Sequence, residues 1–138
     1  TCSAYASRWL NKDRIEKIKT VPLWLVHAQN DPVVKISAFD LENHAPLFDN
    51  AGDFIPIDDF SNALFDRLIN AGNPNVFYSC FDKVIDPSKK YTQADGQPYE
   101  YHGHWSWVYT LSNTCTKQIE GKTTSLFHWL ANQSKQQS

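Results

Sequence analysis

Asp31 and His104 are the residues in this sequence whose types and positions best fit acid–base chemistry. Asp31 follows the apolar stretch VPLWLVHA, and His104 opens the segment HWSWVYTL. A carboxylate that accepts a hydrogen bond from a ring N–H fixes the tautomer of a histidine and stabilises its charged form. A histidine supported in this way can remove a proton from a nucleophile. The two residues therefore predict a general base and its supporting acid.

Two predicted strands would bring these residues to one edge of a sheet. Val21–Ala28 and Asn75–Asp82 are apolar on both faces, which is typical of strands covered on both sides in a parallel sheet. The amphipathic helix expected between them, Asp58–Ala71, makes a strand–helix–strand unit with a right-handed crossover. Ligands of open parallel sheets bind beyond the carboxyl ends of the strands, where Asp31 lies and where a long loop leads to His104.

The remaining segments give weaker signals. Either Asp58 or Asp59 is expected to cap the helix between the strands, and Gly72 is expected to end it. The long stretch Lys35–Ile57 is typical of a functional loop rather than a simple connection. Further helices are expected at Asn11–Lys19, Ala38–Glu42, His104–Leu111 and Thr124–Gln133.

Length and composition restrict the classes of protein that need to be considered. The 138 residues suffice for one domain with a modest core. Apolar residues make up 41% and charged residues 20%, as in an ordinary globular protein. A net charge of -2 gives no reason to expect a nucleic-acid partner. No apolar run is long enough to predict a membrane span.

The stretches VPLWLVHAQNDPVV and YEYHGHWSWVYTL together resemble the C-terminal half of a serine α/β-hydrolase. More narrowly, they are similar to esterases and peptidases related to the prolyl oligopeptidase family. The resemblance covers roughly Val21 to Leu130 and includes the helical stretch ALFDRLINAG. It implies an α/β fold of parallel strands flanked by helices, with Asp31 of NDPVV as triad acid and His104 of GHWSW as triad base. It also implies hydrolysis of an ester or peptide substrate, and no cofactor.

One departure from the family is large. Its nucleophile lies in a G-x-S-x-G motif, and no serine in this sequence is framed in that way. We therefore expect residues 1–138 to form a single partial domain, with the serine and the oxyanion hole on a missing N-terminal segment. The isolated chain should then lack serine-hydrolase activity. Its open sheet edge should pair with the missing segment or with a second copy.

Two other readings of the sequence stay open. The chain can be a complete, non-catalytic α/β binding or interaction domain. Alternatively, His102 and His104 form an H-x-H pair, which on a strand would point both rings the same way and could begin a metal site for a metal-assisted hydrolase. No neighbouring cysteine or carboxylate completes a ligand set, so we assign no metal.

The cysteines carry little information about function. Cys2, Cys80 and Cys115 are widely spaced and odd in number. Cys80 lies in an apolar run and is expected to act as a small buried residue. A disulfide between Cys2 and Cys115 is left open by the sequence.

Histidine and aromatic residues near the predicted site have ordinary structural interpretations. His27 lies within the first predicted strand, which indicates a core histidine or one that supports the site. Trp105, Trp107 and Tyr109 follow His104 closely and are expected to be packing residues, although either tryptophan could also line an acyl or aryl pocket.

Overall fold

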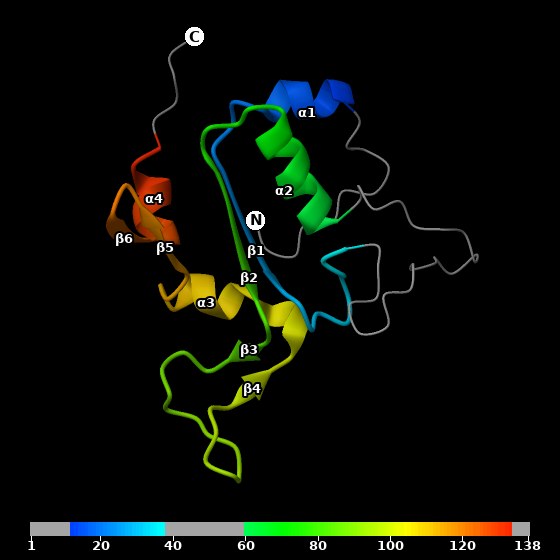
Figure 1. Ribbon diagram of the computed structural model, residues 1–138. Coiled ribbons are helices and arrows are strands. Elements are labelled where there is room, and N and C mark those ends of the chain that lie inside the picture. The colour runs from blue at the N-terminus through cyan, green and yellow to red at the C-terminus, as the bar shows by residue number, and fades with distance from the viewer. Residues whose placement is uncertain (1–11, 38–59, 134–138) are drawn as a thin grey trace, which may run out of the picture.

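The computed structural model describes residues 12–37 and 60–133. Its centre is a parallel pair of strands, β1 (Leu23–Ala28) and β2 (Val76–Phe81), which run side by side in Figure 1. The register is continuous, from Leu23 opposite Val76 to Ala28 opposite Phe81. Both strands lie where the two-sided apolar pattern predicts them, and the predicted parallel pairing is confirmed.

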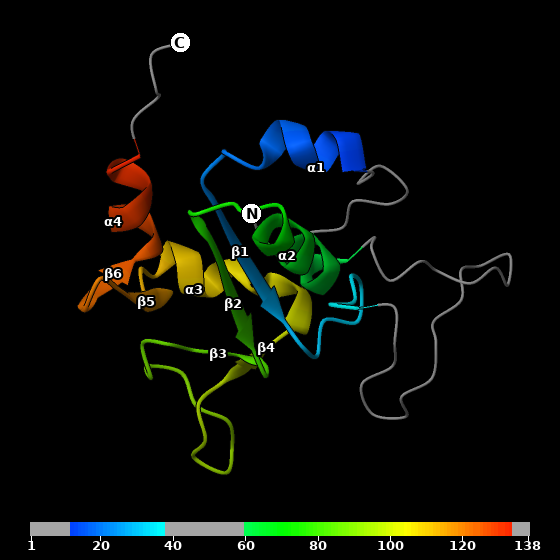
Figure 2. The same ribbon diagram turned by 45° about the horizontal axis from the view of Figure 1, so that its top comes forward.

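Helices cover the two faces of this pair, as Figure 2 shows. On one side lie α1 (Lys12–Ile18) and α2 (Ser61–Asn70), and on the other lie α3 (Trp107–Leu111) and α4 (Leu126–Ala131). Alternate residues of β1 serve the two layers, because successive strand side chains point to opposite faces. The cluster beside α1 and α2 contains Ile15, Leu25, Leu64, Leu68 and Val76. The cluster beside α3 and α4 contains Trp24, Val26, Ala28, Val84, Tyr109, Cys115 and Trp129. The described part of the chain is thus a mixed α/β structure with helices flanking a parallel pair.

Two indole rings lie at the centre of the second cluster. Trp24 is 2% exposed, and its ring centroid lies 5.5 Å from that of Trp129 in an edge-to-face contact. Both indole N–H groups have partners: Trp24 donates to Ser79 Oγ at 2.9 Å and Trp129 to Asn75 Oδ1 at 3.1 Å. Large apolar rings with satisfied polar ends are among the strongest core contributors, and their truncation costs roughly 3–5 kcal/mol.

The bounds of α2 differ from the expectation at its start and agree at its end. The helix begins at Ser61, three residues later than predicted, and its N-cap residue is Phe60, which offers no side-chain cap. Asp58 and Asp59, the predicted caps, lie outside the described residues. At the other end Gly72 N–H donates to Ile69 O at 2.9 Å, which closes the helix where the glycine predicts it.

Two small antiparallel pairs were not foreseen from the sequence. Strands β3 (Val84–Ile85) and β4 (Glu100–Tyr101) pair beyond the end of β2, and β5 (Thr116–Ile119) forms a hairpin with β6 (Lys122–Ser125). The helix predicted at Thr124–Gln133 therefore begins only at Leu126, because the two residues before it belong to β6. The helix predicted at Ala38–Glu42 lies outside the described residues.

The β3–β4 region is tied to the helices behind it. Tyr109 of α3 donates its hydroxyl to Lys83 O at 2.9 Å and accepts from Ile85 N–H at 3.0 Å. The buried Asp86 accepts from Tyr91 N–H at 2.9 Å, and this bond contributes most to holding the pKa of its carboxyl below the usual value. These contacts anchor the segment that leads into His104.

No helix of the described ranges is both long and apolar enough to cross a membrane.

Candidate acid–base site

Asp31 lies in the turn that follows β1, and its carboxylate is held by the backbone. Its Oδ1 accepts hydrogen bonds from Val33 N–H at 2.8 Å and from Val34 N–H at 2.9 Å. This is the pattern of an aspartate turn, in which the side chain replaces a backbone acceptor. The side chain has no solvent exposure. Asp31 is therefore a buried carboxylate of fixed orientation at the carboxyl end of a central strand.

His104 lies in the short 3-10 helix η2 (Gly103–Trp105), directly after β4. The turn is capped by His102, whose Nδ1 accepts from the His104 backbone N–H at 3.3 Å. His102 thus stabilises the turn, and the H-x-H pair does not lie on a strand. Within residues 12–37 and 60–133 no group of three or more histidines, cysteines or carboxylates is placed to hold a metal ion.

The structure brings Asp31 and His104 together across 73 residues of sequence. His104 Nδ1 lies 3.0 Å from Asp31 Oδ2 and 3.2 Å from Oδ1. Since the carboxylate can only accept, Nδ1 carries the proton, and in the neutral ring Nε2 keeps its lone pair. The His104 side chain is 30% exposed, and its Nε2 has no hydrogen-bond partner among the described residues. The predicted proximity is confirmed, and a hydrogen bond of this kind fixes the orientation of the His104 ring.

A glycine allows the two loops to approach so closely. A Cβ added to Gly103 would lie 2.4 Å from the backbone O of Asn30 and 2.6 Å from its Oδ1. Both distances are shorter than nonbonded contacts allow. Asn30 directly precedes Asp31, and Gly103 directly precedes His104, so the absence of a side chain at position 103 permits the close approach of the two loops that carry acid and base.

A second histidine completes a buried network behind Asp31. His27, on β1, has its Nε2 2.8 Å from Val34 O and 3.2 Å from Asp31 Oδ2, and its Nδ1 2.6 Å from Ser61 Oγ. Burial lowers the pKa of His27 despite the opposing effects of the Val34 carbonyl and the Asp31 charge. The sequence leaves open a core or a supporting role for His27, and the structure adds Ser61, the first residue of α2, as its partner.

Ser61, His27 and Asp31 follow the hydrogen-bonding order of a serine hydrolase triad, but they are enclosed. None of the three side chains has any solvent exposure. A nucleophilic serine must reach the substrate carbonyl and needs oxyanion donors beside it. Ser61 is buried at the start of α2 and cannot meet a substrate in this structure. This trio is therefore a buried hydrogen-bond network behind the half-buried ring of His104.

Aromatic rings line the surface beside His104. We call Tyr99, Tyr101, Trp105 and Trp107 the aromatic strip. Successive rings lie 5.1, 6.2 and 6.3 Å apart, and Trp107 contacts His104 edge to face at 5.6 Å. Trp105 is 45% and Trp107 is 37% exposed, so both pack against neighbouring rings at the surface and not in the core. Tyr109 is buried and stacks on Phe81 at 3.9 Å, as expected for a packing residue.

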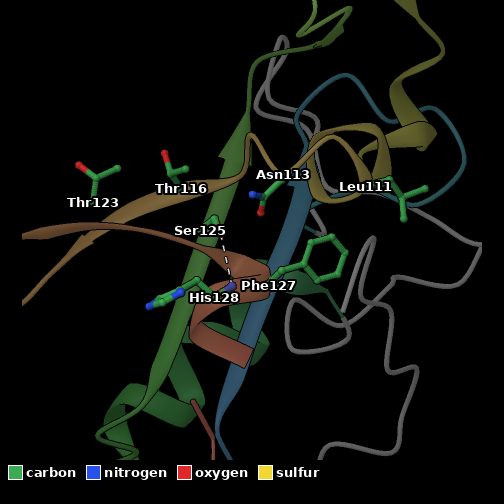
Figure 3. Close-up of a pocket in the computed structure, with 7 residues that line it drawn as sticks. All are labelled: Leu111, Asn113, Thr116, Thr123, Ser125, Phe127 and His128. Carbon is green, nitrogen blue, oxygen red and sulfur yellow. Dashed lines mark hydrogen bonds between the residues drawn. The ribbon is translucent and has the colours of Figure 1, made fainter. Parts of the chain in front are cut away.

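An open hollow lies elsewhere, between α3, the β5–β6 hairpin and α4. Figure 3 shows its lining side chains, among them Thr116, Ser125 and His128. Ser125 Oγ accepts from the His128 backbone N–H at 3.3 Å as the N-cap of α4, which accounts for its position. No lining residue of this hollow belongs to the Asp31–His104 network. The hollow is therefore separate from the acid–base site.

Comparison with protein-family models, with curated proteins and with solved structures finds no match to this chain. The catalytic assignment of Asp31 and His104 accordingly stays a prediction that rests on the chemistry of the site.

Proposed function

We propose that this chain carries the acid and base of a serine hydrolase that cleaves ester or peptide bonds, within the C-terminal portion of an α/β-hydrolase fold. The observation that carries the proposal is the 3.0 Å hydrogen bond between His104 Nδ1 and the buried Asp31 carboxylate. The bond leaves Nε2 as the basic atom of a ring whose side chain is 30% exposed. This combination of a buried acid, an oriented imidazole and a reachable lone pair is what a hydroxyl nucleophile requires.

In the proposed reaction, His104 Nε2 accepts the proton of a serine hydroxyl as its oxygen attacks the substrate carbonyl. Asp31 stabilises the imidazolium that forms, since its carboxylate lies against Nδ1–H. His104 then returns the proton to the leaving alcohol or amine. The serine and the oxyanion donors come from a segment outside these 138 residues. Two observations support that division: the sequence has no G-x-S-x-G, and the one serine in hydrogen-bond contact with a histidine ring in the described residues is buried.

The first experiment uses the chain as it is, with a fluorophosphonate probe. We expect no serine to be labelled and no turnover of an activated ester above the background of a free imidazole. The labelled serine would be identified by mass spectrometry if labelling occurred. Labelling of Ser61 together with turnover would contradict the proposal, because it would make the buried trio the active site.

The second experiment uses the longer protein that contains the nucleophile. His104→Ala should reduce kcat/KM by on the order of 10³-fold or more, leaving the rate that oxyanion stabilisation and substrate binding provide. His128→Ala is the matched control, because His128 is an exposed histidine on α4 that lies outside the network. Equal activities of the two variants would rule out His104 as the base.

A non-catalytic binding or interaction domain is the second candidate function, and the aromatic strip favours it. Exposed aromatic rings are enriched where proteins bind partners or ligands. Under this reading Trp105→Ala and Trp107→Ala would remove binding, while Asp31→Asn would leave it unchanged. The serine-hydrolase proposal requires the opposite sensitivity to Asp31.

A further inference from the structure

The network behind the acid–base pair begins at helix α2 and ends at the half-buried ring of His104. Ser61 Oγ contacts His27 Nδ1 at 2.6 Å, His27 Nε2 contacts Asp31 Oδ2 at 3.2 Å, and the same Oδ2 lies 3.0 Å from His104 Nδ1. The carboxylate thus lies between two histidines that differ in environment. His27 has no exposure, whereas the His104 side chain is 30% exposed.

The partners of His27 determine its tautomer. The carbonyl oxygen of Val34, 2.8 Å from Nε2, can only accept a hydrogen bond, so Nε2 carries the proton. That proton also faces Asp31 Oδ2 at 3.2 Å. In the neutral ring Nδ1 is then an acceptor, and the Ser61 hydroxyl is the donor that it meets. Every polar atom of this buried ring is satisfied in one tautomer and in one orientation.

The surroundings of His27 favour the neutral ring. Asp31 and His104 are the ionisable groups that act on it from the site, and Cys80 is its register partner on β2. The pKa of the Cys80 thiol and that of the neighbouring Tyr78 hydroxyl are raised by burial, so both groups stay neutral. Burial lowers the pKa of His27 itself. His27 therefore adds no positive charge beside Asp31, and the carboxylate charge remains next to His104.

We propose that His27 is a positioning residue: a neutral, Nε2-protonated imidazole, anchored to α2 by Ser61, that holds the Asp31 carboxylate toward His104. Its catalytic significance rests on the proposed function, whereas its tautomer and its effect on the Asp31–His104 hydrogen bond do not. The role differs from that of a core residue, because it depends on one donor atom at Nε2 rather than on ring volume.

The test uses the ¹⁵N-labelled 138-residue chain and long-range ¹H–¹⁵N correlation spectra. His27 should appear as the Nε2–H tautomer and should become charged only at a lower pH than an ordinary histidine, because burial lowers its pKa. His104 should show a protonated, hydrogen-bonded Nδ1. A His27 ring that is protonated at Nδ1, or that becomes an imidazolium near its ordinary pKa, would overturn the proposal.

Variants separate positioning from packing. His27→Gln retains an amide donor near the place of Nε2 and should keep the His104 Nδ1–H resonance, whereas His27→Leu retains bulk without a donor and should lose it. Val26→Ala is the matched control, because Val26 is also buried on β1 but belongs to the cluster beside α3 and α4, away from the His27 network. It should leave the resonance unchanged. Survival of the resonance in His27→Leu would refute a positioning role.

A milder variant keeps the proposal testable if His27→Leu fails to fold. Ser61→Ala removes the donor to Nδ1 and leaves Asp31 untouched. The Nδ1 resonance of His27 should then move toward that of an unprotonated nitrogen without a hydrogen bond. An unchanged resonance would show that Ser61 does not hold the His27 ring. In the longer protein, His27→Leu should lower kcat with little change in KM. Loss of activity in His104→Ala without loss in His27→Leu would refute this inference alone, and no loss in either would refute the proposed function.

Discussion

Gly103 lies against Asn30 so closely that any side chain at position 103 would overlap the Asn30 backbone. The nearest atom to a built Cβ is Asn30 O at 2.4 Å. These residues immediately precede His104 and Asp31, so the contact between them joins the two loops of the acid–base site. The separation of acid and base therefore depends on a backbone contact as well as on the hydrogen bond itself.

We predict that Gly103→Ala separates the two loops and weakens the Asp31–His104 hydrogen bond. Overpacking of this kind costs roughly 1–3 kcal/mol of unfolding free energy. Gly121→Ala is the control: its backbone has φ +77° and its built Cβ meets nothing within 4 Å, so it adds roughly 1–2 kcal/mol of local strain far from the site. Denaturant unfolding should give similar losses for both variants. Only Gly103→Ala should remove the His104 Nδ1–H resonance. If that resonance persists in Gly103→Ala, the two loops can rearrange without breaking the Asp31–His104 hydrogen bond, and the prediction is wrong.

Asp31→Asn should keep the turn and remove the charge. An asparagine Oδ1 can still accept from the Val33 and Val34 N–H groups, but its NH₂ group would face the Nδ1–H of His104. The ring should then change tautomer and place its proton on Nε2. In the longer protein we expect kcat to fall by on the order of 10³–10⁴-fold. Asp66→Asn, on the exposed side of α2, is the control. A loss below about tenfold would exclude Asp31 as the triad acid.

The free energy of unfolding should decrease as the pH falls below about 6.5. His27 has its pKa lowered from 6.5 by burial, so the unfolded chain binds a proton at this position before the folded chain does. The contribution of the neutral His27 to the free energy of unfolding is therefore fully present above the pKa that His27 has in the unfolded chain. It is lost as the pH falls toward the lower pKa that His27 has in the folded chain. Urea unfolding between about pH 8 and pH 5 should show this slope, and His27→Gln should flatten it. Parallel curves for the two proteins would contradict the assignment. Asp86 contributes at lower pH. Its pKa is lowered in the folded chain, so its contribution to the free energy of unfolding is lost only as the pH falls below 3.8, the ordinary pKa of an aspartate.

We also propose that the chain associates with itself or with its missing segment through the sheet. In the described residues β1 pairs with β2 alone, although nearly all of its side chains are buried. An unpaired strand edge invites a further strand. Sedimentation velocity over a dilution series should show species larger than the monomer. A monomer at every concentration would favour the complete binding domain instead.

The strands and the acid–base pair could be predicted because their signals are short-range and directional. The stretch Val21–Ala28 is apolar on both faces, which identifies a covered strand before its partner is known. Parallel strands place their carboxyl ends together, so Asp31 and the later His104 follow from chain order. The contact of 3.0 Å between them agrees with that argument.

Other features depended on contacts that a single sequence does not reveal. Ser61 meets His27 across 34 residues, and neither position carries a periodic pattern that marks the pair. The strands Thr116–Ile119 and Lys122–Ser125 consist largely of polar residues, whose β-propensity depends on their neighbours. The sequence predicts Trp105 as a packing residue but does not show where it packs, and it lies on the surface beside other rings. In each case tertiary surroundings outweigh the local preference.

The pairing of β1 with β2 has a consequence for the order of folding. The Asp31–His104 hydrogen bond joins residues that are 73 positions apart in the sequence. Closing a loop of this length lowers the conformational entropy of the chain, and the contacts between β1 and β2 offset that loss only when both strands are paired. A nascent or partly unfolded chain therefore contains both side chains but not the acid–base pair. We therefore expect the Asp31–His104 hydrogen bond to form only once the sheet is assembled.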